Sequence, residues 1–165
     1  RCGFVWKEPE PGDLRQFVDR ALEDRMELFR AIPYFQDLDE HTIRNLSAKV
    51  RPEFYEAERL LQQENQAVEE LGFIMEGMVE TYRHNASGWV GTVRVDGPGA
   101  YVGMEAVSRE APAMHSVESL GDVFALQVSP QDLRTLIMQH PGLSLGLLRT
   151  VTDKVNQAER LFVAV

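Results

Sequence analysis

The residues that could carry out chemistry form no catalytic set in this sequence. The histidines at positions 41, 84 and 140 fall on a predicted helix, a hairpin and a helix end, and they form no metal-ligand spacing with one another. We find no nucleophile beside a base and no carboxylate pair suited to acid–base work. Cys2 is the only cysteine, which excludes an internal disulfide, a multi-thiolate cluster and a Cys-based zinc site. We therefore expect no enzyme, no metal and no cofactor.

The composition is that of an ordinary globular domain. Of the 165 residues, 44% are hydrophobic and 26% are charged, and this length is enough to bury a core. A net charge of -9 argues against a nucleic-acid partner, because non-specific affinity for nucleic acid comes largely from Lys and Arg. No apolar run approaches the roughly 20 residues that cross a bilayer. Because the chain opens on Arg1 and carries no signal peptide, we expect a fragment of a larger protein, cytoplasmic or on the cytoplasmic side of a membrane protein.

Hydrophobic periodicity divides the chain into four parts. We predict an extended lead-in over residues 1–12, helices over 13–51, a β-roll over 52–128 and helices again over 129–165. The first helix runs from about Leu14 to Ile32, and a second covers Glu40–Val50 with Asp37 or Asp39 as its cap. Short apolar runs then alternate with turns: Phe54-Tyr55, Leu60-Leu61, Phe73–Met75, Met78–Tyr82, Trp89–Val95, Tyr101-Val102 and Val123–Val128. This order predicts an α+β fold, in which N-terminal helices and a C-terminal helix pair flank an antiparallel β-roll of the jelly-roll type.

Two helices are expected after the strands. Ser129-Pro130-Gln131-Asp132 is a start signal, in which Ser129 caps the helix and Pro130 takes the first helical position. His140-Pro141-Gly142 breaks this helix, and the last one is predicted from about Leu143 to the end. Its apolar residues lie three and four apart, as in a short coiled-coil seam: Leu148, Val151, Val155, Ala158, Phe162 and Val165.

Several motifs, in this order, resemble those of the cyclic-nucleotide-binding domain superfamily. That superfamily includes catabolite-activator regulators, kinase regulatory subunits and cation channels. The resemblance covers roughly Leu28 to Val155 and is carried by Glu70–Glu80, Gly97–Gly103, Ser116-Val117, Val128–Leu133 and His140-Pro141. It implies a phosphate-binding cassette at about residues 99–117, where a glycine-assisted turn and a short helix direct backbone N–H groups at an anion.

The resemblance also implies two side-chain anchors, and this sequence lacks both. Family members that bind cyclic nucleotides have a Glu directly after the glycine and an Arg near the end of the cassette. Here these positions hold Met104 and Ala113, and Glu64 stands where the family usually has Gly. Hydrogen bonds to charged groups contribute about 1.5–3 kcal/mol each, so the loss predicts cAMP or cGMP binding weaker by about 10²–10⁴-fold. We expect an altered or vestigial ligand site.

The candidate pocket residues are those of the cassette: Gly103, Met104, Glu105, Ala106, Arg109, Ala113, Met114 and His115. Glu105 could reach a ribose and Arg109 a phosphate, or both could be solvated. His115 could donate to an anion, ligate haem iron as in distant relatives, or be a satisfied, partly buried side chain. Met104 and Met114 would make the phosphate end apolar, either for a less charged ligand or the protein's own tail, or simply to fill a disused cavity.

The last helix has three interpretations. It packs on its own β-roll, forms a dimer seam as in bacterial regulators, or supplies Leu161–Val165 as a self-ligand, which resembles the ether-à-go-go channel subgroup. The Leu14–Ile32 helix sits where channel and kinase relatives transmit motion, which favours an upstream effector.

The resulting hypothesis is a regulatory or sensor domain of a larger protein, with its effector in the same chain. One alternative is an interaction or dimerisation module without a small-molecule ligand. The other is the sensor half of a bacterial DNA-binding regulator.

Overall fold

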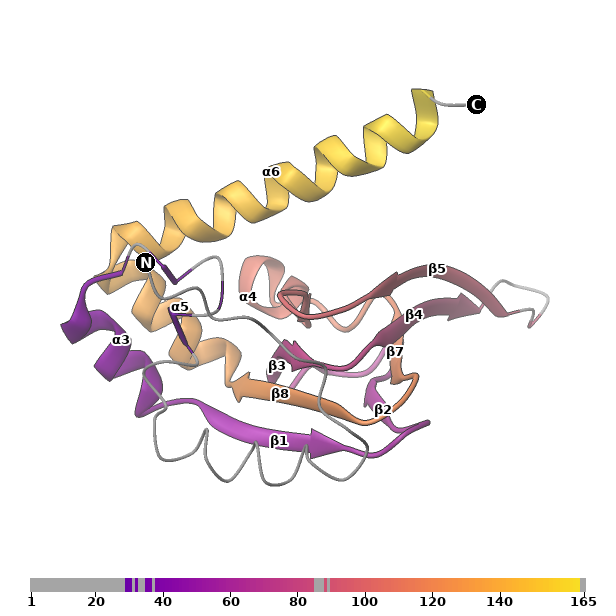
Figure 1. The fold of residues 1–165 in the computed structure, drawn as a ribbon, viewed down its shortest axis with the longest axis horizontal. Helices are drawn as coiled ribbons and strands as arrows, with labels where there is room; N and C mark the ends of the chain where they lie inside the picture. Colours follow the sequence, from indigo (N-terminus) through magenta and orange to yellow (C-terminus); the bar gives the residue numbers. More distant parts are fainter. Residues whose placement is uncertain are drawn as a thin grey trace, which may run out of the picture.

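The computed structural model describes residues 29–30, 32, 35–36, 38–84, 88 and 90–163 (Figure 1). The predicted lead-in, most of the first helix, Asp37, Trp89 and Val165 lie outside the described residues. The same holds for the side chains of Ala158 and Phe162, although their backbone belongs to a helix.

Two four-stranded antiparallel sheets form the centre of the fold, which confirms the predicted α+β β-roll. The first sheet has the order β1 (Arg51–Tyr55), β8 (Val123–Val128), β3 (Leu71–Glu76) and β6 (Tyr101–Val102). The second has the order β2 (Leu60–Gln62), β7 (Ser116–Ser119), β4 (Val79–His84) and β5 (Val90–Asp96). Non-consecutive strands are neighbours in both sheets, so segments far apart in sequence lie side by side at the candidate site.

The central strands of the first sheet, β3 and β8, are buried on both faces. The outer face of this sheet joins the helices in one core cluster, which includes Phe73, Leu126, Leu46 and Leu133. Its inner face meets the second sheet in another cluster, around Ile74, Val102, Val117 and Ala125. This double burial explains why β3 is apolar from Leu71 to Met75, with every residue of the strand buried, including the final Glu76.

Helices gather at one end of the roll (Figure 1). Helix α3 spans Glu40–Ser47, and Asp39 caps it by accepting from the Thr42 N–H at 2.9 Å. Helix α5 spans Pro130–Gln139 with Ser129 as its cap, as predicted. The hydroxyl of Thr42 lies 2.8 Å from His140 Nδ1, which joins α3 to the C-terminal helices.

Helix α6 spans Pro141–Val163 and begins two residues earlier than predicted. Only His140 interrupts the helices, because Pro141 has a φ suited to the first helical turn and needs no N–H partner there. Leu143 is buried against the helical core, and from there α6 extends away from α3 and α5 (Figure 1). No helix in the described part of the chain combines the length and apolar character needed to cross a bilayer.

Strand β5 is an edge strand of the second sheet, and its residues 92–95 are all exposed. Arg94 and Asp96 pair in register with Thr81 and Val79, whose side chains are buried between the sheets. Val95 and Val93 point away, with 49% and 52% of their surface exposed. The charged side chains of this edge strand reach the surface, where Arg94 is 44% exposed and pairs with Asp96.

Replacing Gly77 with Ala tests the packing of the β3–β4 turn. Gly77 has φ +86°, and a Cβ there would lie 2.3 Å from the Asp122 carbonyl oxygen. We expect Gly77→Ala to lower the free energy of unfolding by at least about 2 kcal/mol in denaturant titration. Gly121→Ala is the control, because nothing lies within 4 Å of its added Cβ. Equal stability of the two variants would contradict this packing.

Candidate functional site

The cassette begins at a glycine that no other residue can easily replace. Gly103 follows β6 with φ +86°, and a Cβ there would lie 2.7 Å from Val68 Cγ1 and 3.3 Å from Gln62 Oε1. The short helix α4 (Glu105–Arg109) follows and ends at Glu110 in the left-handed conformation. The chain then returns through residues 111–115 to β7. The predicted turn and short helix are therefore present.

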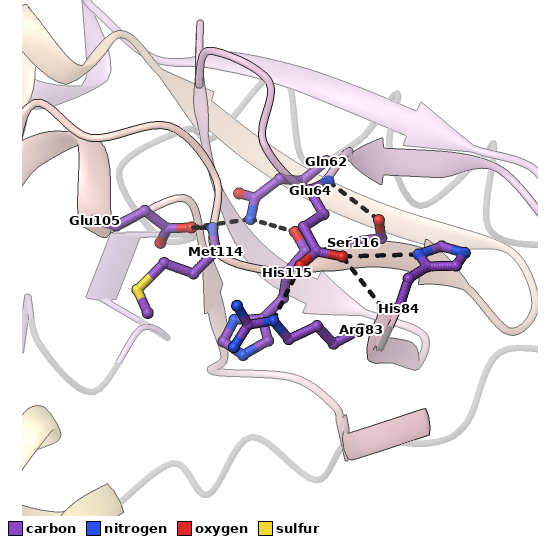
Figure 2. A network of polar contacts seen from close by, with 8 residues as sticks. All are labelled: Gln62, Glu64, Arg83, His84, Glu105, Met114, His115 and Ser116. Carbon is purple, nitrogen blue, oxygen red and sulfur yellow. Dashed lines mark hydrogen bonds and ion pairs between the residues drawn. The ribbon is translucent and has the colours of Figure 1, made fainter. Parts of the chain in front are cut away.

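Glu105 points back into the cassette and connects three segments (Figure 2). Its Oε1 accepts from the Met114 backbone N–H at 3.2 Å and from Gln62 Nε2 at 3.0 Å. Gln62 Nε2 also donates to the His115 carbonyl oxygen at 3.0 Å. Glu105 is therefore not the fully solvated side chain that the sequence allowed, because it is half-buried and hydrogen-bonded.

Ala113 is held by its backbone and is only 2% exposed. Its N–H donates to the Gln66 carbonyl oxygen at 2.9 Å, and its own carbonyl oxygen accepts from the Asn65 N–H at 2.8 Å. These two bonds fix the end of the cassette against the loop after β2. Met114, the next residue, is half exposed.

A second carboxylate network lies beside the first (Figure 2). Glu64 accepts from Arg83 Nε at 3.0 Å and from the His84 backbone N–H at 3.2 Å, and its own N–H donates to Ser116 Oγ. The His84 N–H, and next the Arg83 guanidinium, hold the pKa of Glu64 below its usual range. The sequence identified Glu64 as unusual only because it replaces Gly, and the Arg83 partnership was missed because it joins β4 to a distant loop.

Two arginines of the second sheet that lie near the cassette are already paired. Arg83 pairs with Glu64, and Arg94 pairs with Asp96. His115 adds no stable positive charge, because partial burial, followed by the repulsion of Arg94 and Arg83, lowers its pKa from 6.5. A neutral His115 at pH 7 is a weak anchor for an anion.

The remaining predicted residues do not converge on one pocket. Met104 is partly buried against the helical core instead of forming an apolar phosphate end with Met114. Ala106 is buried, and Arg109 is exposed at the end of α4. The structure therefore brings together Gly103, Glu105, Ala113, Met114 and His115, and it directs Met104 and Arg109 elsewhere. Within the described residues, no group of three His, Cys, Asp or Glu side chains could hold a metal ion.

Arg134 of α5 holds the end of the cassette helix. Its guanidinium donates to the carbonyl oxygens of Ala106 and Val107 and to Glu110 Oε1, the last at 2.6 Å. An arginine that caps the last carbonyls of a helix satisfies acceptors that would otherwise lack donors. This contact couples the cassette to the C-terminal helices, and sequence reasoning had no signal for it.

A polar cavity of about 500 Å³ opens between β1 and the loop after β2. Arg51 spans it by an ion pair with Glu70 at 2.7 Å, and burial raises the pKa of Tyr55 at its wall to about 12. Gln62 and Val68 border both this cavity and Gly103. The sequence did not indicate this cavity, because its walls come from β1, β8 and the 61–70 segment.

The profile of the cyclic nucleotide-binding domain matches residues 52–140. The cyclic nucleotide-gated ion channel 2 of Arabidopsis thaliana is 25% identical over 133 residues, covering 75% of this chain and 18% of that protein. This chain spans between 18% and 24% of the length of the curated relatives that it matches.

Two solved structures share the fold. The N-terminal domain of a transcriptional regulator from Streptomyces coelicolor A3(2) superposes with a TM-score of 0.62 at 22% identity, covering 82% of this chain and 94% of that one. The regulatory subunit of a cAMP-independent protein kinase A from Trypanosoma cruzi, bound to guanosine, has a TM-score of 0.68 at 18% identity. That match covers 78% of this chain and 44% of the subunit.

Removing Arg134 tests its hold on the cassette. We expect Arg134→Ala to lower the free energy of unfolding by about 2 kcal/mol and to speed amide exchange in α4, because the carbonyl oxygens of Ala106 and Val107 lose a charged donor. Arg44→Ala is the control, since this exposed residue pairs only within α3 and its loss is expected to cost less than about 0.5 kcal/mol. Unchanged exchange in α4 of Arg134→Ala would contradict the coupling.

Proposed function

The chain belongs to the cyclic nucleotide-binding domain family, and we propose that it is a regulatory domain whose site takes a ligand other than a cyclic nucleotide. The family membership accounts for the roll, the cassette and the terminal helices. The proposal concerns the ligand, and it depends most on one observation, that Ala113 stands where a phosphate-binding Arg is expected.

At Ala113 the chain has no side-chain donor for a phosphate. The backbone N–H and carbonyl oxygen of Ala113 are both committed to the loop after β2. Met104, at the position of the expected ribose-binding Glu, packs against the helical core. The nearby Arg83 and Arg94 are paired with carboxylates, so a phosphate would have to break an existing ion pair to recruit either of them.

A nucleoside is the ligand class that this site suits best. A nucleoside has the base and the ribose of a cyclic nucleotide, which the β-roll can contact, but it has no phosphate that requires an arginine. The Trypanosoma cruzi relative, which is described as cAMP-independent and is bound to guanosine, makes a nucleoside a reasonable first probe.

The effector is proposed to lie elsewhere in the same parent chain. This chain corresponds to about a fifth of the curated relatives, one of which is an ion channel, and to the N-terminal domain of a transcriptional regulator. A signal from the cassette would reach such an effector through Arg134 and the C-terminal helices.

A second candidate function, dimerisation, is favoured by one feature of α6. Leu148, Val151 and Val155 are 60%, 43% and 51% exposed, although their spacing gives them a common helix face. An exposed apolar strip of this kind is stabilised when a second copy of the helix covers it.

Calorimetry tests the ligand proposal. We expect cAMP and cGMP to bind in the millimolar range, because both side-chain anchors are replaced. The Met104→Glu/Ala113→Arg double variant is expected to gain about 10²–10⁴-fold in affinity for cAMP, and Ala113→Met is a control that adds length without charge. Thermal unfolding of each variant confirms that it is folded. A Kd for cAMP below about 10 μM in the unaltered protein would contradict the proposal.

Sedimentation tests the dimer. Val155→Asp places a charge on the apolar strip and is expected to weaken self-association by at least about tenfold. Asn156→Asp adds the same charge at the adjacent exposed position outside the Leu148–Val151–Val155 spacing, and it is expected to leave self-association unchanged. A wild-type protein that is already monomeric at high concentration would rule out the dimer.

A further inference from the structure

The Glu105 carboxylate occupies a backbone donor of the cassette. Its Oε1 takes the Met114 N–H, which belongs to the first residue after Ala113 and therefore lies where the cassette would meet a phosphate. The same oxygen takes one N–H of Gln62 across from β2 (Figure 2). A bound phosphate would have to displace this carboxylate to reach the Met114 N–H.

The orientation of the Gln62 amide is fixed by its partners. Nε2 donates to Glu105 Oε1 and to the His115 carbonyl oxygen, and neither of these atoms can donate. The other end of the amide is therefore the oxygen. This Oε1 is buried and receives no hydrogen bond from the described residues, and it lies beside Gly103, 3.3 Å from where a Cβ would be. A buried acceptor without a protein donor can be satisfied by an N–H or O–H of a ligand or by an ordered water, and a ligand that reaches it would gain a hydrogen bond there.

The negative charge of Glu105 also favours a ligand that donates an N–H or O–H. Glu64 and Asp96 are each paired with an arginine, whereas Glu105 takes part in no ion pair among the described residues. Its Oε1 instead accepts from two N–H groups, those of Gln62 and Met114. An incoming phosphate would meet a like charge, and a hydroxyl or amine would meet an acceptor.

We propose that Glu105 serves as the cassette's own anion, so that Glu105 and Gln62 Oε1 form an acceptor pair that selects a neutral, hydroxyl-bearing ligand of the nucleoside class and rejects its cyclic phosphate. This inference rests on the proposed function and names the residues that set its specificity. Glu105 excludes the phosphate by charge repulsion. The Gln62 oxygen favours the ligand by accepting a hydrogen bond from it.

The test measures the affinities of guanosine and of 3′,5′-cyclic GMP for three proteins by calorimetry. The unaltered protein is expected to bind guanosine at least about tenfold more tightly than cyclic GMP. Glu105→Gln keeps the shape of the side chain and removes its charge, and we expect it to gain at least about tenfold in affinity for cyclic GMP. Asp122→Asn is the matched control, because it removes the same charge in the exposed β7–β8 turn, and it is expected to change neither affinity.

A fourth protein, Gln62→Ala, removes the unpaired oxygen and is expected to lose at least about threefold in affinity for guanosine. The inference is overturned if Glu105→Gln gains no affinity for cyclic GMP, or if guanosine shows no binding at millimolar concentration. Tight binding of cAMP by the unaltered protein would instead overturn the proposed function itself. Thermal unfolding of each variant shows that a lost affinity does not come from a lost fold.

Discussion

The hydrogen bonds that the Glu105 carboxylate accepts are the interaction on which the candidate site depends. They join α4 to β2 and to the segment that leads into β7. A cassette that binds an anion needs that anion to hold its donors together, and here a side chain of the same chain does so. The Met114 N–H and the Gln62 Nε2 donor are therefore satisfied in the absence of any ligand, whereas Gln62 Oε1 is not.

The β-roll makes this arrangement possible by bringing distant segments together. Strands β2, β7, β4 and β5 are neighbours in one sheet, although β2 and β7 are more than fifty residues apart. Gln62 and Glu105 consequently meet, and so do Glu64 and Arg83. Arg134 of α5 fixes the other end of α4, so the cassette is anchored to both the sheet and the helices.

Much of this architecture follows from local sequence signals. Asp39, Ser129 and Pro130 mark helix starts through short-range capping geometry, and Val123–Val128 is a strand with the predicted bounds. The ordered motifs identify the family, which the match over residues 52–140 confirms. They also predict a cassette, and the structure has a left-handed Gly103 followed by a short helix in that region. The start of α6 was predicted two residues late, because Pro141 was interpreted as a break although it begins the helix.

The site itself was less predictable, because its contacts are long-range. Glu105 and Met114 are nine residues apart, and Gln62 is forty-three residues from Glu105. No local pattern reveals that Met104 turns to the helical core while Glu105 turns inward. Similarly, nothing in the sequence of β5 indicates that Arg94 is already paired with Asp96.

Amide hydrogen exchange at Met114 in the ligand-free protein measures whether the Glu105 carboxylate occupies the Met114 N–H. If Glu105 occupies this donor, the Met114 N–H exchanges slowly without any ligand, although its side chain is half exposed. We expect Glu105→Ala to speed exchange at Met114 at least about tenfold while the amides of β3 and β8 keep their protection. Equal exchange at Met114 in both proteins would contradict this expectation, because the N–H would then be free to meet a phosphate.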